Sequence, residues 1–237
     1  MPAPPADDKL YQVSVIPFIR QGGFAGLVPV GELKAHGDFG VAVADDIDGE
    51  LTLLDGRMYQ ALSDGRVQTA RDEMAVPFAM VTRFCPTLEL PLGAQPDRRS
   101  LQARLDERLE SRNVFWAIAV EGLFTRVQNR AFPRQARPYR PQTAIADQER
   151  RIEARDVEGT LVGFWSPRLA AGLTAPGYHF HFVSGDGRAS GHTLELSLER
   201  GVARLAPLSR YEVALPTTAD YWTAELSPDQ VGEPRRD

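Results

Sequence analysis

The sequence predicts an α+β protein that is rich in sheet, with few helices and two β-based halves. Alternating or β-branched apolar segments recur along the chain, a pattern typical of half-buried strands. Asp-Gly pairs begin at Asp48, Asp55 and Asp64, each between apolar runs. Because Asp-Gly is a strong signal for tight hairpin turns, we expect a meander of several strands in the first half of the chain.

The composition is that of an ordinary globular protein. Hydrophobic residues make up 43% of the 237 residues and charged residues 25%, which argues against a disordered or membrane-embedded chain. The formal net charge is −5, with acidic and basic residues interspersed, so we expect no nucleic-acid partner. No run approaches the roughly 20 apolar residues of a membrane span, and the start MPAPPADDKLYQ lacks the order of a signal peptide. We therefore expect a cytoplasmic protein without a membrane partner.

The two β-rich halves are expected to be joined by a loop. Residues 1–9, rich in proline, alanine and aspartate, predict a flexible N-terminal arm. Residues 10–134 form the expected N-terminal half, and the polar, proline-broken residues 135–150 the connecting loop. Residues 151–237 then form the C-terminal half, with several strand-like segments and a C-terminal tail.

One amphipathic helix is expected in the first half, near residues 100–112. Leucines at positions 101, 105 and 109 recur every fourth residue, which places them on one helical face, and Ser100 is suited to the N-cap. The next segment, FWAIAVEGLFTRVQNRAF at 115–132, has the strand pattern again. We expect a turn within it at Glu121-Gly122.

Three of the four histidines lie in one short segment, GYHFHFVSGDGRASGHTLEL, at His179, His181 and His192. Residues two apart in a strand project from the same face, so His179 and His181 point the same way. The turn SGDGRASG would return His192 on the neighbouring strand. Three imidazoles arranged in this way leave coordination positions open, which is typical of a catalytic metal site. The pattern therefore predicts a metal centre on strands of the C-terminal half.

The metal itself is not identified by these ligands. Imidazole suits zinc, copper, iron or nickel, and the single cysteine, Cys85, argues against a thiolate cluster. A lone His-x-His pair is often just the polar face of a strand, so it is the third histidine that favours a site. His36, far away in KAHGDFG, is expected to be structural or to support a ligand.

Several sequence blocks follow one another in an order that is characteristic of one family. They are KAHGDFG, DIDGELTLLDG, Tyr59, FWAIAVEGLF, QNRAFPRQARPY, VEGTLVGFWSP, GYHFHF, SGH and LPTTADYW. From about Tyr11 to Leu226 the sequence thereby resembles the alpha-acetolactate decarboxylase family. The resemblance implies an enzyme that converts 2-acetolactate to acetoin and carbon dioxide with Zn²⁺ as its cofactor.

The resemblance also implies which residues form the site. It makes His179, His181 and His192 the zinc ligands, and it places Glu50 of the DGEL block and Arg130 of the QNR block beside them. Glu50 would then be the acid that protonates the intermediate left by loss of carbon dioxide, and Arg130 would orient the substrate carboxylate. Without the resemblance, a glutamate after a turn or an arginine in an arginine-rich segment would be interpreted as solvated.

A second catalytic glutamate is implied in the C-terminal tail. Glu233 is the nearest candidate, with Glu225 as the alternative. The family often has a threonine seven residues before the DGEL glutamate, where this chain has Val43, so a hydroxyl contact to the ligand is expected to be missing.

The implied chemistry needs no organic cofactor. Loss of carbon dioxide from 2-acetolactate leaves an electron pair that the neighbouring ketone can accept as an enediolate, and zinc would stabilise that negative charge as a Lewis acid. Protonation of the enediolate on one face would give a single acetoin enantiomer.

Two other functions are compatible with a histidine cluster. A cupin-like metal oxygenase also draws histidines from neighbouring strands, but it usually needs a carboxylate shortly after His-x-His, for which Asp186 is the candidate. A non-enzymatic metal-binding domain would have no need of Glu50 and Arg130. In either case the exposed edges of a sheet-rich fold favour an interface, and we expect a homodimer that, as an enzyme, acts on a small-molecule substrate.

Overall fold

Two sheets form most of the structure, a computed structural model that describes residues 8–227. The strands of the first sheet are β1 (Lys9–Val13), β3 (Phe39–Val43), β4 (Glu50–Leu54), β5 (Arg57–Ala61), β6 (Val67–Thr69), β8 (Phe78–Thr82) and β14 (Arg210–Ala214). Their order is β14-β1-β8-β3-β4-β5-β6. Strand β14 is parallel to β1, whereas the other neighbours are antiparallel.

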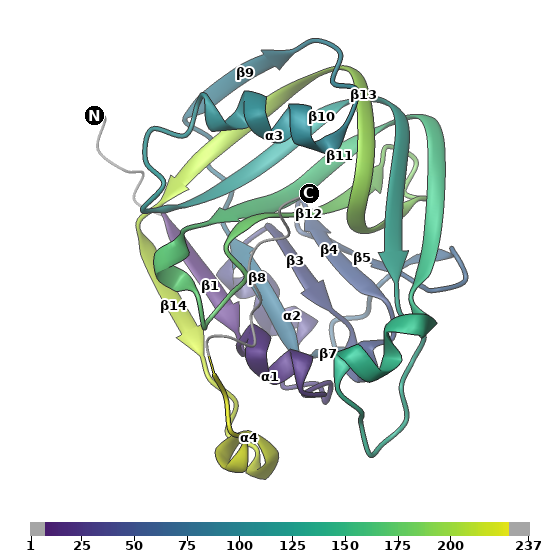
Figure 1. The fold of residues 1–237 in the computed structure, drawn as a ribbon, viewed down its shortest axis with the longest axis vertical. Coiled ribbons are helices and arrows are strands. Elements are labelled where there is room, and N and C mark those ends of the chain that lie inside the picture. The colour runs from purple at the N-terminus through teal and green to yellow at the C-terminus, as the bar shows by residue number, and fades with distance from the viewer. Residues whose placement is uncertain (1–7, 228–237) are drawn as a thin grey trace.

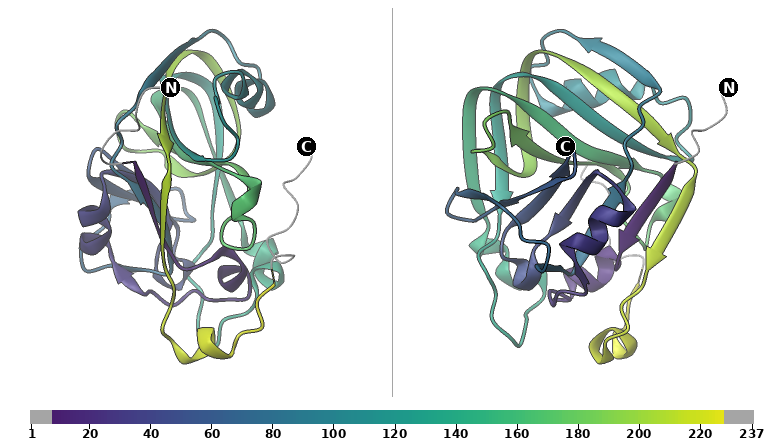
Figure 2. Two further views of the ribbon diagram at one scale, coloured as in Figure 1. Left: turned by 90° about the vertical axis from the view of Figure 1, so that its left-hand side faces the viewer. Right: turned by 180° about the vertical axis from the view of Figure 1, so that it is seen from behind.

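The second sheet arches over the first, as Figures 1 and 2 show. Its strands are β9 (Leu88–Leu92), β10 (Phe115–Ala131), β11 (Arg150–Ser166), β12 (Gly177–Ser184) and β13 (Ser190–Leu208). Their order is β10-β11-β12-β13-β9, and β10 also pairs with β13. Four long strands therefore close on themselves as a small barrel, with β9 attached to β13.

Short elements connect and cover the two sheets. The helices are α1 (Ile16–Arg20), α2 (Val30–His36), α3 (Arg98–Asp106) and α4 (Ala219–Thr223), and the 3₁₀ turns are η1 (Asp45–Ile47), η2 (Gln142–Gln148) and η3 (Arg168–Ala170). Strands β2 (Val28–Pro29) and β7 (Ala75–Val76) pair with each other. Within residues 8–227, no helix is long and apolar enough to cross a membrane. The prediction of a sheet-rich α+β fold with few helices is confirmed.

The alternation of side chains along the strands builds separate cores. Successive residues of β10 point alternately into two cores. One core lies between the two sheets, and the other is enclosed by the second sheet and α3. Those between the sheets are Phe115, Ala117 and Ala119, and those in the second core are Trp116, Ile118 and Val120. A third core lies on the far face of the first sheet, where α2 contributes Val30 and Leu33.

The predicted Asp-Gly turns lie between neighbouring strands of the meander. Asp55-Gly56 forms the β4–β5 hairpin with φ values of 51° and 74°, as a tight turn of this kind requires. Asp48-Gly49 precedes β4, and Asp64-Gly65 lies between β5 and β6. The three Asp-Gly pairs therefore mark turns before β4, between β4 and β5, and between β5 and β6.

The turn expected at Glu121-Gly122 is wrong, because β10 runs through it without a break. Gly122 lies opposite Gly159 on β11 and Gly201 on β13. A Cβ atom at Gly122 would lie 2.3 Å from the carbonyl oxygen of Arg200. Glycine is therefore present because the strands approach closely here, and not because the chain reverses.

The boundary between the sheets also differs from the expected division at residues 135–150. Strand β10, which the sequence placed in the first half, is hydrogen-bonded to β11 and β13, and β9 joins the same sheet. Strand β14, from the expected second half, joins the first sheet. The loop around η2 therefore connects two strands of one sheet.

The amphipathic helix is present as α3 but begins earlier than expected. Asp97 is its N-cap, because its side chain accepts a hydrogen bond from the amide of Ser100 at 2.7 Å. Ser100 lies inside the helix and is not the cap. Leu101 and Leu105 are fully buried, and Leu109 is buried just after the helix ends.

Candidate metal centre

Strands β12 and β13 bring the three clustered histidines together. Phe180 and Phe182 on β12 point into the core enclosed by the second sheet. His179 and His181 alternate with them along the strand, so both histidines face the first sheet. His181 pairs directly with His192 across the β12–β13 ladder. The returning strand predicted from the sequence is therefore observed.

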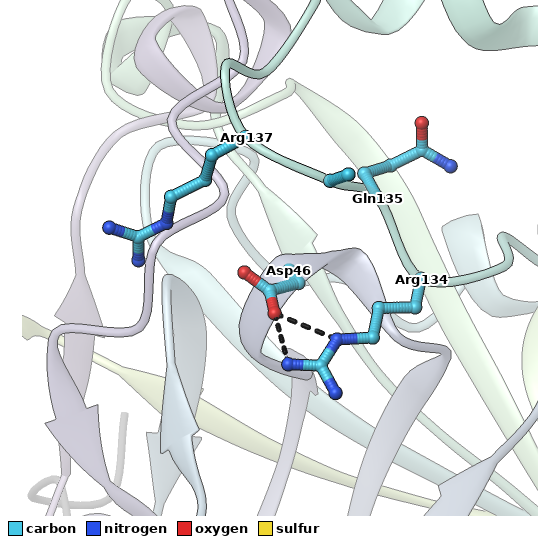
Figure 3. Close-up of a pocket in the computed structure, with 5 residues that line it drawn as sticks. Asp46, Arg134, Gln135 and Arg137 are labelled. Carbon is cyan, nitrogen blue, oxygen red and sulfur yellow. Dashed lines mark hydrogen bonds and ion pairs between the residues drawn. The ribbon is translucent and has the colours of Figure 1, made fainter.

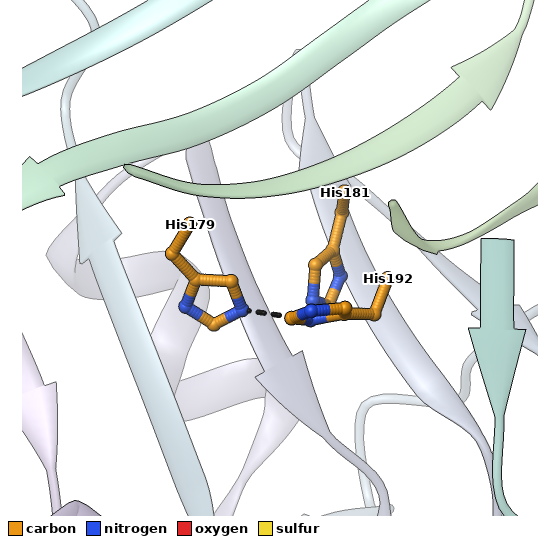
Figure 4. Close-up of side chains that lie close together, drawn as sticks. All are labelled: His179, His181 and His192. Atoms are coloured by element: carbon orange, nitrogen blue, oxygen red, sulfur yellow. Dashed lines mark hydrogen bonds between the residues drawn. The ribbon is translucent and has the colours of Figure 1, made fainter. Parts of the chain in front are cut away.

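The imidazole rings converge on one small region (Figure 4). One ring nitrogen from each histidine lies within 4.8 Å of the others. Nε2 of His179 lies 3.1 Å from Nδ1 of His192. Two nitrogens bound to one metal at about 2.1 Å each are separated by roughly 3–3.4 Å, so this pair already has the spacing of two ligands.

The orientation of His181 is fixed from the first sheet. Its Nδ1 lies 2.9 Å from the carbonyl oxygen of Leu51, which can only accept, so Nδ1 carries the proton. Its Nε2 is buried and has no hydrogen-bond partner among the described residues. An unpartnered buried nitrogen with a free lone pair is what a metal ligand requires.

Burial also keeps the histidines neutral. It lowers the pKa of His179 to about 3, and the charges of Arg130 and Arg98 act in the same direction. Burial likewise lowers the pKa of His181 and His192 well below the ordinary value of 6.5, aided by the neighbouring imidazoles and by Arg130. The described side chains therefore fit a cation held by neutral imidazoles.

Glu50, the first residue of β4, lies beside this cluster. Its Oε2 is 3.8 Å from Nε2 of His181, and its side chain is 6% exposed. Burial raises the pKa of Glu50 to about 7; the Arg130 charge opposes this shift and the Glu149 charge adds to it. A buried carboxyl of this kind can hold a proton near neutral pH.

Arg130, near the end of β10, lies opposite His192 in the β10–β13 register. Its Nη1 donates to Oε2 of Glu149 at 3.1 Å, and both side chains are largely buried. Its Nε is buried without a hydrogen-bond partner among the described residues. The guanidinium therefore keeps donor capacity beside the histidines, while Glu149 holds one end of it.

Comparison with known proteins identifies the family. Residues 10–228 match a sequence profile described as alpha-acetolactate decarboxylase. The chain belongs to the alpha-acetolactate decarboxylase family.

Individual relatives match this chain over nearly its full length. The alpha-acetolactate decarboxylase of Methanosarcina mazei is 39% identical over 221 residues, covering 93% of this chain and 77% of that protein. The Brevibacillus brevis enzyme is 33% identical, covering 96% and 85%. The crystal structure of alpha-acetolactate decarboxylase from Bacillus subtilis strain 168 superimposes with a TM-score of 0.91 at 32% identity, covering 94% of this chain and 96% of that one.

Three other residues expected from the family resemblance have different outcomes. Glu233 lies outside the described residues. Glu225 is exposed beside α1, where its carbonyl oxygen accepts a hydrogen bond from Gln21 at 2.8 Å. Val43, at the end of β3, lies directly opposite Glu50 on β4. A threonine at that position would place its hydroxyl on the strand next to the glutamate, so the expected loss of a hydroxyl contact falls beside Glu50.

Two residues considered from the sequence lie apart from the cluster. Asp186 is in the β12–β13 turn, where Ser184 and the amide of Arg188 bind its carboxylate, and its side chain is 60% exposed. The carboxylate expected of a cupin-like site is therefore not supplied by Asp186. His36 stacks on Tyr11 with ring centroids 3.6 Å apart, and it is not among the histidines whose ring nitrogens converge.

Two contributors to this decarboxylase-family site were missed from the sequence. Thr52 is fully buried, with its hydroxyl 3.3 Å from Nδ1 of His181. It follows Glu50 by two residues on one strand, so the period of two could have indicated it. Glu149, which binds Arg130, lies in the connecting loop, and no pattern in the sequence distinguishes it from the other charged residues there.

The family block PRQARPY forms a second polar cluster, shown in Figure 3. A pocket of about 350 Å³ lies beside it, lined by Asp46, Arg134, Gln135, Ala136 and Arg137. Arg134 donates to one carboxylate oxygen of Asp46 through Nε at 2.9 Å and Nη2 at 2.6 Å, and Tyr139 donates to the other oxygen. Because β4 follows closely after η1, the contacts of Asp46 hold the backbone segment that leads to Glu50.

Proposed function

We propose that this protein decarboxylates 2-acetolactate, releasing carbon dioxide and acetoin, with a zinc ion held by His179, His181 and His192. The observation that carries the proposal is the convergence of three neutral imidazoles with a buried carboxyl and a guanidinium, in a chain of the alpha-acetolactate decarboxylase family. Zinc accepts three nitrogen ligands and leaves a position open for substrate.

The metal would supply one kind of chemistry. Bound by three neutral ligands, zinc would act as a Lewis acid toward the hydroxyl and ketone oxygens of the substrate and stabilise the negative charge that develops there. The unpartnered Nε2 of His181 and the 3.1 Å spacing of the His179 and His192 nitrogens support this assignment.

Arg130 is proposed to bind the substrate carboxylate before it leaves. Its Nη1 is held by Glu149, and its Nε remains available as a donor. A guanidinium binds a carboxylate through parallel hydrogen bonds, which would orient the bond that breaks. When that bond breaks, carbon dioxide departs and the electron pair passes to the neighbouring ketone to give the enediolate.

Glu50 is proposed to protonate the carbon that lost carbon dioxide. The carboxyl enters from β4 on one side of the histidines, so a proton transferred from it reaches one face of the planar enediolate. Its burial favours the protonated form needed for that transfer. Protonation from a fixed side gives one acetoin enantiomer.

A homodimer in the cytoplasm completes the proposal. Leu169, Leu173, Leu215 and Trp222 are large apolar side chains that are exposed in the single chain, and a second copy that covered them would remove this apolar surface from water. Light scattering of the purified protein would give twice the chain mass of 26.2 kDa, whereas a mass of one chain would contradict the dimer.

The test of the reaction is acetoin formation from racemic 2-acetolactate. Purified protein is assayed as isolated, after removal of metal with a chelator, and after addition of Zn²⁺. We expect activity to disappear with the metal and return with zinc, and chiral chromatography to show one acetoin enantiomer. Metal-loaded, folded protein that forms no acetoin would overturn the proposal.

A further inference from the structure

Of the four strand ladders that close the barrel, the shortest lies where two of the proposed ligands pair. Strands β12 and β13 pair through three residue pairs, which end at His181 opposite His192. Beyond this point β12 continues along β11 and β13 continues along β10. On the side of this pair where His179 and Thr193 lie, no β12–β13 ladder therefore fixes the distance between the two strands.

The side chain of Arg98 bridges this opening. Its Nη2 donates to the carbonyl oxygen of Tyr178 on β12 at 3.2 Å. Its Nη1 donates to the carbonyl oxygens of Leu194 at 3.1 Å and Thr193 at 3.4 Å on β13. Tyr178 immediately precedes His179 and Thr193 immediately follows His192, so the guanidinium joins the two strands one residue away from each histidine.

Arg98 is itself held in place by the helix that it begins. Leu101 and Leu105 fix α3 in the core, and Asp97 caps its first turn. At the other end of the helix, Asp106 accepts a hydrogen bond from the hydroxyl of Tyr178 at 2.8 Å. The helix thus binds Tyr178 through both its carbonyl oxygen and its side chain, and it provides a rigid support for the bridge.

We infer that Arg98 is a positioning residue that sets the separation of His179 and His192 for metal binding. The inference rests on the proposed zinc site. A planar guanidinium can bond to acceptors on two strands at once, which an ammonium group at the end of a shorter, freely rotating stem cannot do with the same geometry. Without the bridge, the three imidazoles should still be present, but the separation of His179 and His192 should no longer be fixed.

The experiment compares the metal affinity of Arg98→Met and Arg98→Lys with that of the parent, by competition for Zn²⁺ with a chromophoric chelator. Arg99→Met is the matched control, because Arg99 is the exposed next residue of the same helix. We expect the dissociation constant to rise about 10- to 100-fold in Arg98→Met, as for other partners that orient metal ligands. Arg98→Lys should lie between the two, and Arg99→Met should match the parent.

A spectroscopic measurement separates positioning from general stability. With saturating Co²⁺ in place of zinc, the visible absorption of Arg98→Met should shift because the ligand geometry changes, whereas Arg99→Met should keep the parent spectrum. If Arg98→Met does not fold, Arg98→Lys provides the same comparison. Unchanged affinity and spectrum in the folded variants would overturn the inference, whereas a parent protein that binds no metal would overturn the proposed function instead.

Discussion

The Nδ1 atom of His181 donates to the carbonyl oxygen of Leu51 at 2.9 Å, so the first sheet orients a proposed ligand that the second sheet carries. A neutral imidazole has one N–H group, and placing it on Nδ1 leaves the lone pair of Nε2 for a metal. Leu51 follows Glu50 on β4. One strand therefore sets both the tautomer of a ligand and the place of the proposed acid.

Thr52 supports the same histidine, which leads to a prediction for Thr52→Val. Its hydroxyl lies 3.3 Å from Nδ1 of His181 and 3.4 Å from the hydroxyl of Ser190. Replacement by the isosteric valine should raise the zinc dissociation constant about tenfold and lower the free energy of unfolding by about 1 kcal/mol. Chelator competition and urea unfolding measure the two effects. Thr217→Val, at an exposed position between β14 and α4, should change neither.

Glu50→Gln should separate chemistry from metal binding. The substitution keeps the size of the side chain but removes the acidic proton, so kcat for acetoin formation should fall by about 100-fold or more. The zinc content measured by atomic emission should stay at the parent value, because the amide leaves the three histidines in place. Glu158→Gln, at an exposed position on β11, serves as the control. Parent-like turnover in Glu50→Gln would show that another group delivers the proton.

The parts of the fold that were predictable are those coded over a few residues. Asp55-Gly56 identified a hairpin because both positions need positive φ, which this pair tolerates. The pairing of β10 with β13, by contrast, joins segments far apart in the sequence, and no local pattern specifies it. Gly122 was interpreted as a turn because glycine serves both turns and close strand contacts, and only the position of Arg200 distinguishes them.

The site divides in the same way. His179, His181 and His192 could be grouped because the period of a strand and one short turn place them together. Glu50 and Arg130 come from distant strands and were indicated only by the family resemblance. Thr52 and Glu149, which support His181 and Arg130, act through contacts across the chain. The first contact depends on how the two sheets pack, and the second on the path of the loop at η2 between β10 and β11. Composition and spacing encode neither.

Arg130→Met should weaken substrate recognition more than it weakens the fold. The proposed carboxylate contact is lost, and kcat/KM should fall by about 100-fold, which corresponds to about 2.7 kcal/mol of transition-state stabilisation. Steady-state kinetics with the zinc-loaded protein give this value. Arg126→Met is the matched control on β10, since Arg126 bonds to Glu153 at 2.7 Å in a more exposed pair. An equal loss in both variants would assign the effect to the strand and not to the site.

Asp46 should make the stability of the protein sensitive to acid. Burial alone would raise the pKa of Asp46, but hydrogen bonds from Tyr139 and Arg134 and the charges of Arg134 and Arg137 outweigh it and hold the pKa below the ordinary value of 3.8. A lowered folded-state pKa means that the stabilisation is fully present above the unfolded value and is lost as the pH falls through the folded one.

The test is Asp46→Asn, measured by urea unfolding at neutral pH and in steps below pH 4. At neutral pH the variant should be less stable by about 1–2 kcal/mol, since a charged hydrogen-bonded pair is lost at a partly exposed site. The difference from the parent should shrink as the pH falls, because the parent carboxylate is then protonated as well. Asp46 and Ile47 have φ values of 57° and 54°, a conformation that the surrounding contacts must hold. The variant should therefore also lose acetoin-forming activity, because η1 relaxes and Glu50 shifts. A difference in the free energy of unfolding that stays constant with pH would show that the carboxylate charge of Asp46 does not hold this turn.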